Sequence, residues 1–314
     1  MTVSHGLPRT FRRADAILGE SLVYAPDAGM LWCDITAGLL HVSPIAGPED
    51  GSLDTTFALP APLASFGRRA AADVTLSPRA LGPHDDVPAA SGFVASLGDR
   101  VVLLDDHGAI ERELANIRHS ESGLRLNEGK CDPYGRWVTG SMNLVSGAPD
   151  GAIHQVSATG DQRVLRGGFG VANGFEWSAD GSVMYFTDTS VETIYRADYS
   201  PDGELGEVTV FHAGEAHDGL AIDAEGYLWS GIYGGGRVVR YSPDGVEDLV
   251  IELPAPNITS VAFGGEGLST LFVASARENL TEEDLVEHPL SGSVFAIETG
   301  IHGFYPRFFD WVSN

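Results

Sequence analysis

The chain has 314 residues, of which 43% are hydrophobic, and its mean hydropathy of −0.01 allows a sizeable buried core. It carries 19 Lys and Arg against 44 Asp and Glu, a net charge of −25, which argues against nucleic acid and anionic membrane surfaces as partners. Its two cysteines, Cys33 and Cys131, lie in apolar, strand-like surroundings and predict buried free thiols rather than a disulfide framework.

The N-terminal segment 1–20 contains no apolar stretch of the kind that a secretion signal needs, and no run of 18 apolar residues occurs in the sequence. We therefore expect a soluble, cytoplasmic protein. Arg12 and Arg13 are interpreted as surface charges rather than as a targeting signal.

From residue 18 onward, short aromatic and β-branched runs separated by glycine turns recur as a repeated unit. The unit occurs as Leu18–Ile35, Leu126–Asn143, Val171–Gly203, His217–Gly245 and Ile258–Ala276, with turn glycines Gly29, Gly135, Gly181, Gly226 and Gly267. The intervals between these glycines are 106, 46, 45 and 41 residues, and the first interval fits two repeats with the middle glycine missing. Such periods predict an all-β fold, a single six-bladed β-propeller domain over residues 1–314 with four antiparallel strands in each blade.

Three segments depart from the repeat. Residues 60–90, rich in Pro, Ala and Arg, predict an insertion near the start of the second blade, whose loop is either a lid at the site or an unrelated surface loop. Residues 277–290 predict a loop with one helical turn, because the acidic run that follows Thr281 is typical of a helix start rather than of a second metal site. The aromatic C-terminus, residues 304–314, predicts packing against a blade edge that helps to close the ring.

Polar residues recur at one position of the repeat. Counting back eight residues from three of the turn glycines gives Asn127, Asn173 and Asp218, and counting back nine from Gly29 gives Glu20. Equivalent positions of successive blades lie at equivalent places around the axis, so these side chains should converge at one mouth of the central channel. Two carboxylates and two amides at one point favour a hard divalent cation with oxygen ligands. For any single pair such as Asn173-Gly174, a role as mere turn residues is the competing interpretation.

The sequence resembles the SMP-30/gluconolactonase/LRE family in several ordered motifs. They are LGE (18–20), RLNEGKCDPYGRW (125–137), ANGFEWSADG (172–181), DGLAIDAEG (218–226), GGGRVVRYSPDG (234–245) and TSVAFGG (259–265). The resemblance implies a six-bladed propeller that binds one divalent metal ion and hydrolyses a sugar lactone. It implies Glu20, Asn173 and Asp218 as metal ligands, with Asp218 also as the carboxylate that activates water. It further implies substrate contacts at Arg125 and Asn127.

Two neighbours of these residues are further substrate-binding candidates. Glu128 stands where the family usually has Asp, and His217 stands where it commonly has proline. A buried packing histidine is the alternative for His217, and a surface ion pair with Glu121 is the alternative for Arg125. The family's usual Gly-Pro after the first ligand is Ser21-Leu22 here, and the carboxylate that some relatives carry after the Gly-Ser-Met turn is absent from residues 143–145. The reaction type is therefore better defined than the substrate.

Three hypotheses follow. The first is a metal-dependent lactonase acting on an aldonolactone or related cyclic ester. The second is the same scaffold acting on a non-sugar substrate such as a phosphotriester, or catalysing ring formation. The third is a non-catalytic metal-binding or interaction propeller, against which the polar convergence argues. Oxygen-only ligands suit Ca²⁺ first, with Mg²⁺, Mn²⁺ and Zn²⁺ as alternatives. The sequence leaves open the oligomeric state, the pathway and the identity of the lactone.

Overall fold

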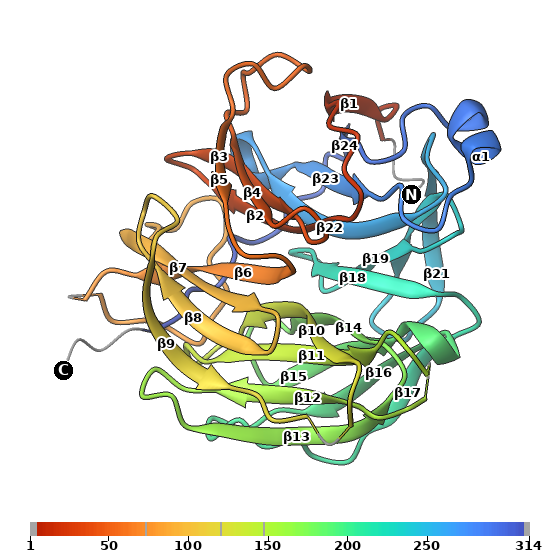
Figure 1. Ribbon diagram of the computed structural model, residues 1–314. Coiled ribbons are helices and arrows are strands. Elements are labelled where there is room, and N and C mark those ends of the chain that lie inside the picture. Colours follow the sequence, from red (N-terminus) through yellow and green to blue (C-terminus); the bar gives the residue numbers. More distant parts are fainter. Residues whose placement is uncertain (1–4, 73, 120, 147, 311–314) are drawn as a thin grey trace.

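The repeats fold into six four-stranded antiparallel sheets that stand in a ring, as expected for a six-bladed β-propeller (Figure 1). The structure is a computed structural model that describes residues 5–72, 74–119, 121–146 and 148–310. Within these residues, blade 1 contains β2 (Gly19–Ala25), β3 (Gly29–Asp34), β4 (Leu39–Ser43) and β5 (Thr55–Ala58). Blade 2 contains β6 (Leu63–Ala70), β7 (Ala90–Leu97), β8 (Arg100–Leu104) and β9 (Ile110–Asn116). Blade 3 contains β10 (Leu124–Cys131), β11 (Trp137–Asn143), β12 (Gly151–Val156) and β13 (Gln162–Phe169).

The remaining blades follow the same order. Blade 4 contains β14 (Ala172–Trp177), β15 (Val183–Asp188), β16 (Thr193–Asp198) and β17 (Thr209–Ala213). Blade 5 contains β18 (His217–Ile222), β19 (Leu228–Ile232), β20 (Arg237–Tyr241) and β21 (Glu247–Glu252). Blade 6 contains β22 (Ile258–Gly264), β23 (Thr270–Ser275), β24 (Val294–Glu298) and β1 (Arg9–Arg12). The helices described are the 3₁₀ turns η1 (Thr189–Val191) and η2 (Glu266–Leu268) and the short helix α1 (Glu282–Glu287), and none is long and apolar enough to cross a membrane.

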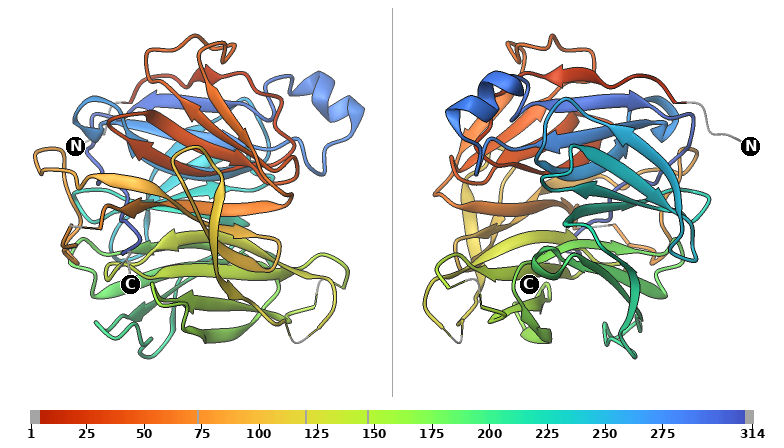
Figure 2. Two further views of the ribbon diagram at one scale, coloured as in Figure 1. Left: turned by 60° about the vertical axis from the view of Figure 1, so that its left-hand side comes forward. Right: turned by 90° about the vertical axis from the view of Figure 1, so that its right-hand side faces the viewer.

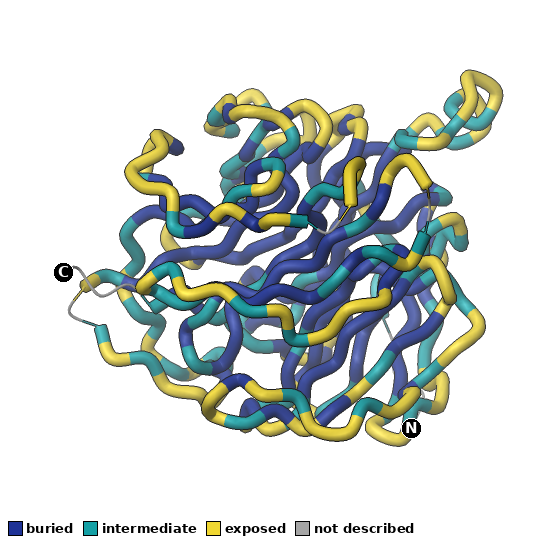
Figure 3. The backbone as a smooth tube through the Cα atoms, turned by 60° about the horizontal axis from the view of Figure 1, so that its bottom comes forward, coloured by how far each residue is buried: buried dark blue, intermediate teal, exposed yellow. Residues whose placement is uncertain are grey.

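Burial decreases from the axis to the rim of each blade. The innermost strands β2 and β18 are buried along their whole length, whereas the outermost strands β9 and β13 expose most of their residues (Figure 3). Apolar side chains fill the space between adjacent blades, and each of four blades contributes one fully buried tryptophan: Trp32, Trp137, Trp177 and Trp229. This packing holds the inner strands rigidly around the channel, which is what a site at the channel mouth requires.

The ring is closed by the N-terminus rather than by the C-terminus. Strand β1 pairs with β24 as the outermost strand of blade 6, so the first and last parts of the chain share one sheet (Figure 2). The prediction that the aromatic C-terminus packs against a blade edge is confirmed, since Phe309 pairs with Arg69 of β6, but the C-terminus does not close the ring. Residues 304–310 instead cross the end of the channel, and Phe309 and Asp310 hydrogen-bond to β6 and to the β10–β11 turn. The last four residues of that prediction lie outside the described residues.

Arg12 anchors the closing strand and is not the surface charge predicted from the sequence, whereas Arg13 is exposed as expected. The Arg12 side chain is 1% exposed, donates to both carboxylate oxygens of Asp54 at 2.8 and 3.0 Å, and donates to the carbonyl of Pro44 at 2.7 Å. It thereby ties blade 6 to the β4–β5 loop of blade 1. We expect Arg12→Met to lower the free energy of unfolding by about 3–5 kcal/mol, because it leaves the buried Asp54 carboxylate without its counter-charge. Chemical denaturation measures this loss, and Arg13→Met is the matched control that should change stability little.

The insertion occupies residues 71–89, between β6 and β7, where the other blades have a tight glycine turn. It explains the missing turn glycine. We call the side of the ring where the innermost strands begin the site face, and the side where they end the far face. The insertion lies on the far face, where Ala80 N–H donates to Ala179 O and Tyr305 N–H donates to Leu81 O. A lid over the predicted site is therefore excluded for this loop.

Two smaller predictions are confirmed. The segment 277–290 contains α1, whose N-terminus is capped by Thr281 in a reciprocal capping box with Asp284. Cys33 and Cys131 are buried free thiols.

Candidate functional site

The innermost strands share an irregularity at the predicted ligand positions. In β2, β10, β14, β18 and β22, two residues stand opposite one on the next strand, as in a β-bulge, close to the start of the strand. A bulge bends its strand and redirects side chains, and bulges are frequent beside active sites. Glu20, Asn127, Asn173 and Asp218 all lie at these bulges. Glu20 and Asn173 stand one residue before the bulge, whereas Asn127 and Asp218 are its first residue, so the predicted equivalence of the four positions holds to within one residue.

Glycines at the bulges let neighbouring inner strands approach closely. Gly174 has φ +45°, and a Cβ built on it would lie 2.3 Å from the carbonyl oxygen of Asp218. A Cβ on Gly219 would lie 2.7 Å from the carbonyl oxygen of Thr259. Larger residues would push the strands apart. The glycines after Asn173 and Asp218 therefore bring the inner strands β14, β18 and β22 close together and are not hairpin residues.

Hydrogen bonds connect the site residues both within blade 3 and between neighbouring blades. Asn173 Nδ2 donates to Asp218 Oδ1, and Arg125 Nη1 donates to Asn127 Oδ1 at 2.9 Å. Glu128 accepts the N–H of Gly174 at 2.6 Å, which links blade 3 to blade 4. The structure thus gathers these polar groups at the site face of the channel.

Three buried carboxyl groups lie within each other's electric field. Burial, followed by the charge of Glu128, raises the pKa of Glu20 to about 8. Burial also raises the pKa of Glu128 to about 7. Burial and then the charges of Glu20 and Glu128 raise the pKa of Asp218 well above its usual range. Such repulsion between desolvated carboxylates is relieved by a proton or by a cation.

The donor set fits a hard divalent cation. Asn173 Oδ1 is a buried oxygen with no hydrogen-bond partner in the described part of the chain, although its amide nitrogen is fully used. An orphaned carbonyl oxygen beside two repelling carboxylates, Glu20 and Asp218, is the arrangement that Ca²⁺ or a similar ion satisfies. Among the residues described, no group of three His, Cys, Asp or Glu forms a metal site. The donor set proposed above contains only two carboxylates, Glu20 and Asp218, and its third donor is the amide oxygen of Asn173.

The structure does not bring His217 into this cluster. Its ring is fully buried inside blade 5, with Nδ1 3.1 Å from Ser230 Oγ and its faces near His212 and Tyr241. Burial lowers its pKa to about 3. His217 therefore has the geometry of the packing histidine that the sequence analysis gave as the alternative to a substrate contact.

Sequence analysis missed Glu278, which follows β23 in the loop before α1. Its backbone oxygen accepts Asn257 Nδ2 at 2.7 Å, and the neighbouring Asn279 donates to Tyr233 Oη at 2.9 Å. Its charge acts on Arg125, Glu20 and Asp218, so the carboxyl group belongs to the same polar region. No repeat position marks this residue, because it comes from a loop that occurs in one blade.

Arg125 lies near the carboxylates of Glu20, Asp218 and Glu278 rather than in a surface ion pair with Glu121. It is half-buried, Nη1 also donates to Leu126 O at 2.8 Å, and burial lowers its pKa while the nearby carboxylates, Glu278 first, oppose that shift.

Comparisons with known proteins agree with this architecture. A family model described as "SMP-30/Gluconolactonase/LRE-like region" matches residues 18–277. A 6-deoxy-6-sulfogluconolactonase of Pseudomonas putida is 35% identical over 93% of this chain and 94% of its own length. An L-arabinolactonase of Azospirillum brasilense is 32% identical over 86% of this chain and 87% of its own length. The crystal structure of a calcium-binding protein, regucalcin, from Agrobacterium tumefaciens has a TM-score of 0.84 at 27% identity and covers 98% of this chain and 99% of that chain.

Proposed function

The chain belongs to the SMP-30/gluconolactonase/LRE-like family, and from this premise we propose that it is a metal-dependent hydrolase that opens a sugar lactone. Two relatives carry the names of sugar lactonases, which supports this reaction class. The observation that carries the proposal is the convergence of Glu20, Asn173 and Asp218, with the unpartnered Asn173 Oδ1, at the site face of the channel.

In this proposal Glu20, Asn173 and Asp218 hold one divalent cation through oxygen atoms. A bound cation would supply Lewis acidity for an ester carbonyl at this position. Oxygen-only donors favour Ca²⁺, and the structurally similar regucalcin of Agrobacterium tumefaciens is described as a calcium-binding protein. Mg²⁺, Mn²⁺ and Zn²⁺ are the competing ions in any test of metal identity.

The chain's own groups perform the proton transfers and hold the substrate. Asp218 takes a proton from the attacking water, whose oxygen forms the new bond to the carbonyl carbon. When the acyl–oxygen bond of the ring breaks, Asp218 returns the proton to the leaving ring oxygen. Arg125 binds a substrate oxygen by charge-assisted hydrogen bonds through the nitrogens that Asn127 and Leu126 do not occupy. Asn127 and Glu128 are the further polar side chains that contact the substrate in this proposal.

A panel of substrates tests this function. Hydrolysis of a lactone yields a hydroxy acid that ionises at neutral pH, so we expect proton release from at least one γ- or δ-aldonolactone. The panel includes arabinonolactone, gluconolactone and a 6-sulfonated gluconolactone, and a set of phosphotriesters. Turnover of phosphotriesters alone would replace the proposed substrate class with the second hypothesis. Metal binding without turnover of any member would favour the non-catalytic hypothesis.

A further inference from the structure

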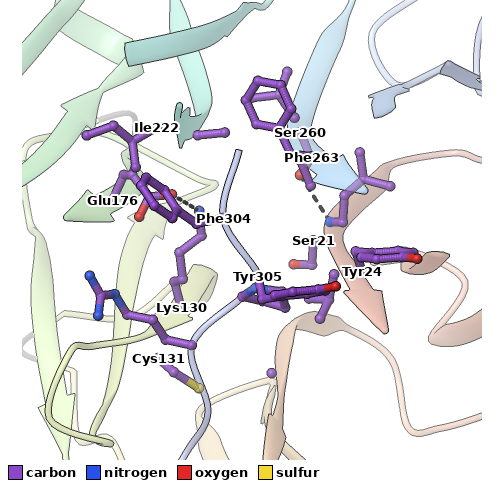
Figure 4. Close-up of a pocket in the computed structure, with 18 of the residues that line it drawn as sticks. Ser21, Tyr24, Lys130, Cys131, Glu176, Ile222, Ser260, Phe263, Phe304 and Tyr305 are labelled. Carbon is purple, nitrogen blue, oxygen red and sulfur yellow. Dashed lines mark hydrogen bonds and ion pairs between the residues drawn. The ribbon is translucent and has the colours of Figure 1, made fainter. Parts of the chain in front are cut away.

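The central channel contains a cavity of about 80 Å³ beneath the carboxylates, between the site and the far face. Aromatic residues form much of its wall, and the C-terminal segment 304–307 lines its far side (Figure 4). Six hydroxyl-bearing or charged side chains outside the aromatic residues also line it: Ser21, Glu128, Lys130, Glu176, Ser260 and Arg307. The proposed function assigns no role to this space.

Ser21 stands out among these residues because its conformation and its burial are both unfavourable. Its φ of 53° lies in the left-handed region, which the glycine at the matching position of blade 4, Gly174, adopts at 45° without a side chain to strain. Its hydroxyl is buried and has no nitrogen or oxygen partner among the described residues, and only the weakly polar thiol of Cys33 lies close to it. Backbone strain and an unsatisfied polar group at one residue beside a candidate active site indicate that the residue has a function there.

The hydroxyl of Ser21 points into the cavity from the side opposite to Lys130 and Glu176 (Figure 4). Lys130 Nζ donates to Glu176 Oε2 at 3.0 Å and to the carbonyl of Leu220 at 2.8 Å, which leaves its third N–H for another acceptor. Ser260 Oγ accepts the N–H of Leu22 at 3.1 Å and keeps its own proton to donate.

A buried water needs two to four polar partners and roughly 10–15 Å³ of cavity. The cavity meets both conditions with room for more than one water molecule. Ser21 also connects directly to the site, because its backbone N–H donates to Glu20 Oε2 at 3.0 Å.

We propose that Ser21 is a positioning residue whose hydroxyl anchors buried water in this cavity, and that this water solvates the Glu128 carboxylate, while the Ser21 backbone N–H holds Glu20 Oε2. This inference rests on the proposed function for the identity of Glu20 as a ligand, but not for the presence of the water.

Ser21→Ala tests the proposal because it removes the hydroxyl and keeps the strained backbone and the Cβ. We expect the affinity of the metal-stripped protein for Ca²⁺, measured by calorimetry, to fall about tenfold in Ser21→Ala and in Ser21→Gly. A crystal structure of the wild type should show ordered water within hydrogen-bond distance of Ser21 Oγ, and this water should be absent from Ser21→Ala. Ser291→Ala is the matched control, since Ser291 Oγ is also buried without a partner among the described residues but does not line the cavity.

Unchanged Ca²⁺ affinity in both Ser21 variants, together with no ordered water on Ser21 Oγ in the wild-type crystal, would overturn the proposal. Neither readout needs turnover. If the wild type hydrolyses no lactone, the proposed function fails, while the affinities and the crystal structure still decide the role of Ser21. If the wild type binds no Ca²⁺, the crystal structure of the metal-free protein alone decides it.

Discussion

Replacing Asp218 by Asn should lower kcat/KM for the lactone by at least about a thousandfold, the effect of losing a general base from an otherwise intact site. The amide keeps the shape of the side chain and can still bond to Asn173, but it cannot accept the proton of the attacking water. It also removes one of the two anionic metal ligands. Steady-state kinetics at saturating metal separates the first effect from the second.

The same substitution should not destabilise the metal-free protein. The pKa of Asp218 is raised by burial and by the charges of Glu20 and Glu128, so its ionised form is unfavourable in the folded state at neutral pH. Asp198→Asn, which changes an exposed carboxylate on β16, is the control and should leave both rate and stability near wild type. If Asp218→Asn retained more than a tenth of the wild-type kcat/KM, Asp218 would not be the base.

Removing the metal should make stability fall with rising pH. Glu20 and Glu128, with folded pKa values of about 8 and about 7 against unfolded values of 4.5, bind more protons in the folded state than in the unfolded state. Their contribution to the free energy of unfolding is therefore fully present below about pH 4.5 and is lost as the pH rises through 7 and 8. Each unit of pKa difference corresponds to about 1.4 kcal/mol, so the loss over this window amounts to several kcal/mol.

A bound cation should abolish this loss, because it stabilises the anionic carboxylates in place of protons. The difference in Tm between metal-loaded and EDTA-treated protein should consequently grow from pH 5 to pH 8.5. Thermal unfolding at a series of pH values measures it, and Glu20→Gln should flatten the curve of the EDTA-treated protein. Parallel curves with and without metal would contradict the placement of the cation beside these carboxylates.

The blade count and the grouping of polar side chains at one mouth of the channel could be predicted because both depend on a local pattern that repeats. The turn at position 181 requires glycine because its φ is 77°. Equivalent turn glycines recur at a nearly constant number of residues after the bulge of the inner strand, which in blade 4 follows Asn173. Every blade imposes the same spacing, so one chain supplies several independent observations of it.

Structural features that occur in only one blade could not be predicted from the repeat. The burial of Arg12 depends on Asp54 and Pro44, which only the closed ring brings beside β1. The sequence predicts an insertion within residues 60–90, but the face on which it lies depends on whether it follows the first or the second strand of the blade. Glu278 enters the site from a loop that has no counterpart in the repeat, and the inward or sideways direction of His217 depends on the bulge beside it.

The most direct test of the central claim is lactone turnover by metal-stripped protein as one divalent ion is titrated back. We predict that stripped protein hydrolyses the lactone at no more than about a hundredth of the full rate, and that the rate returns in proportion to the occupancy of a single site with one ion per chain. Full turnover by protein shown to contain no metal would contradict the claim that Glu20, Asn173 and Asp218 act through a bound cation.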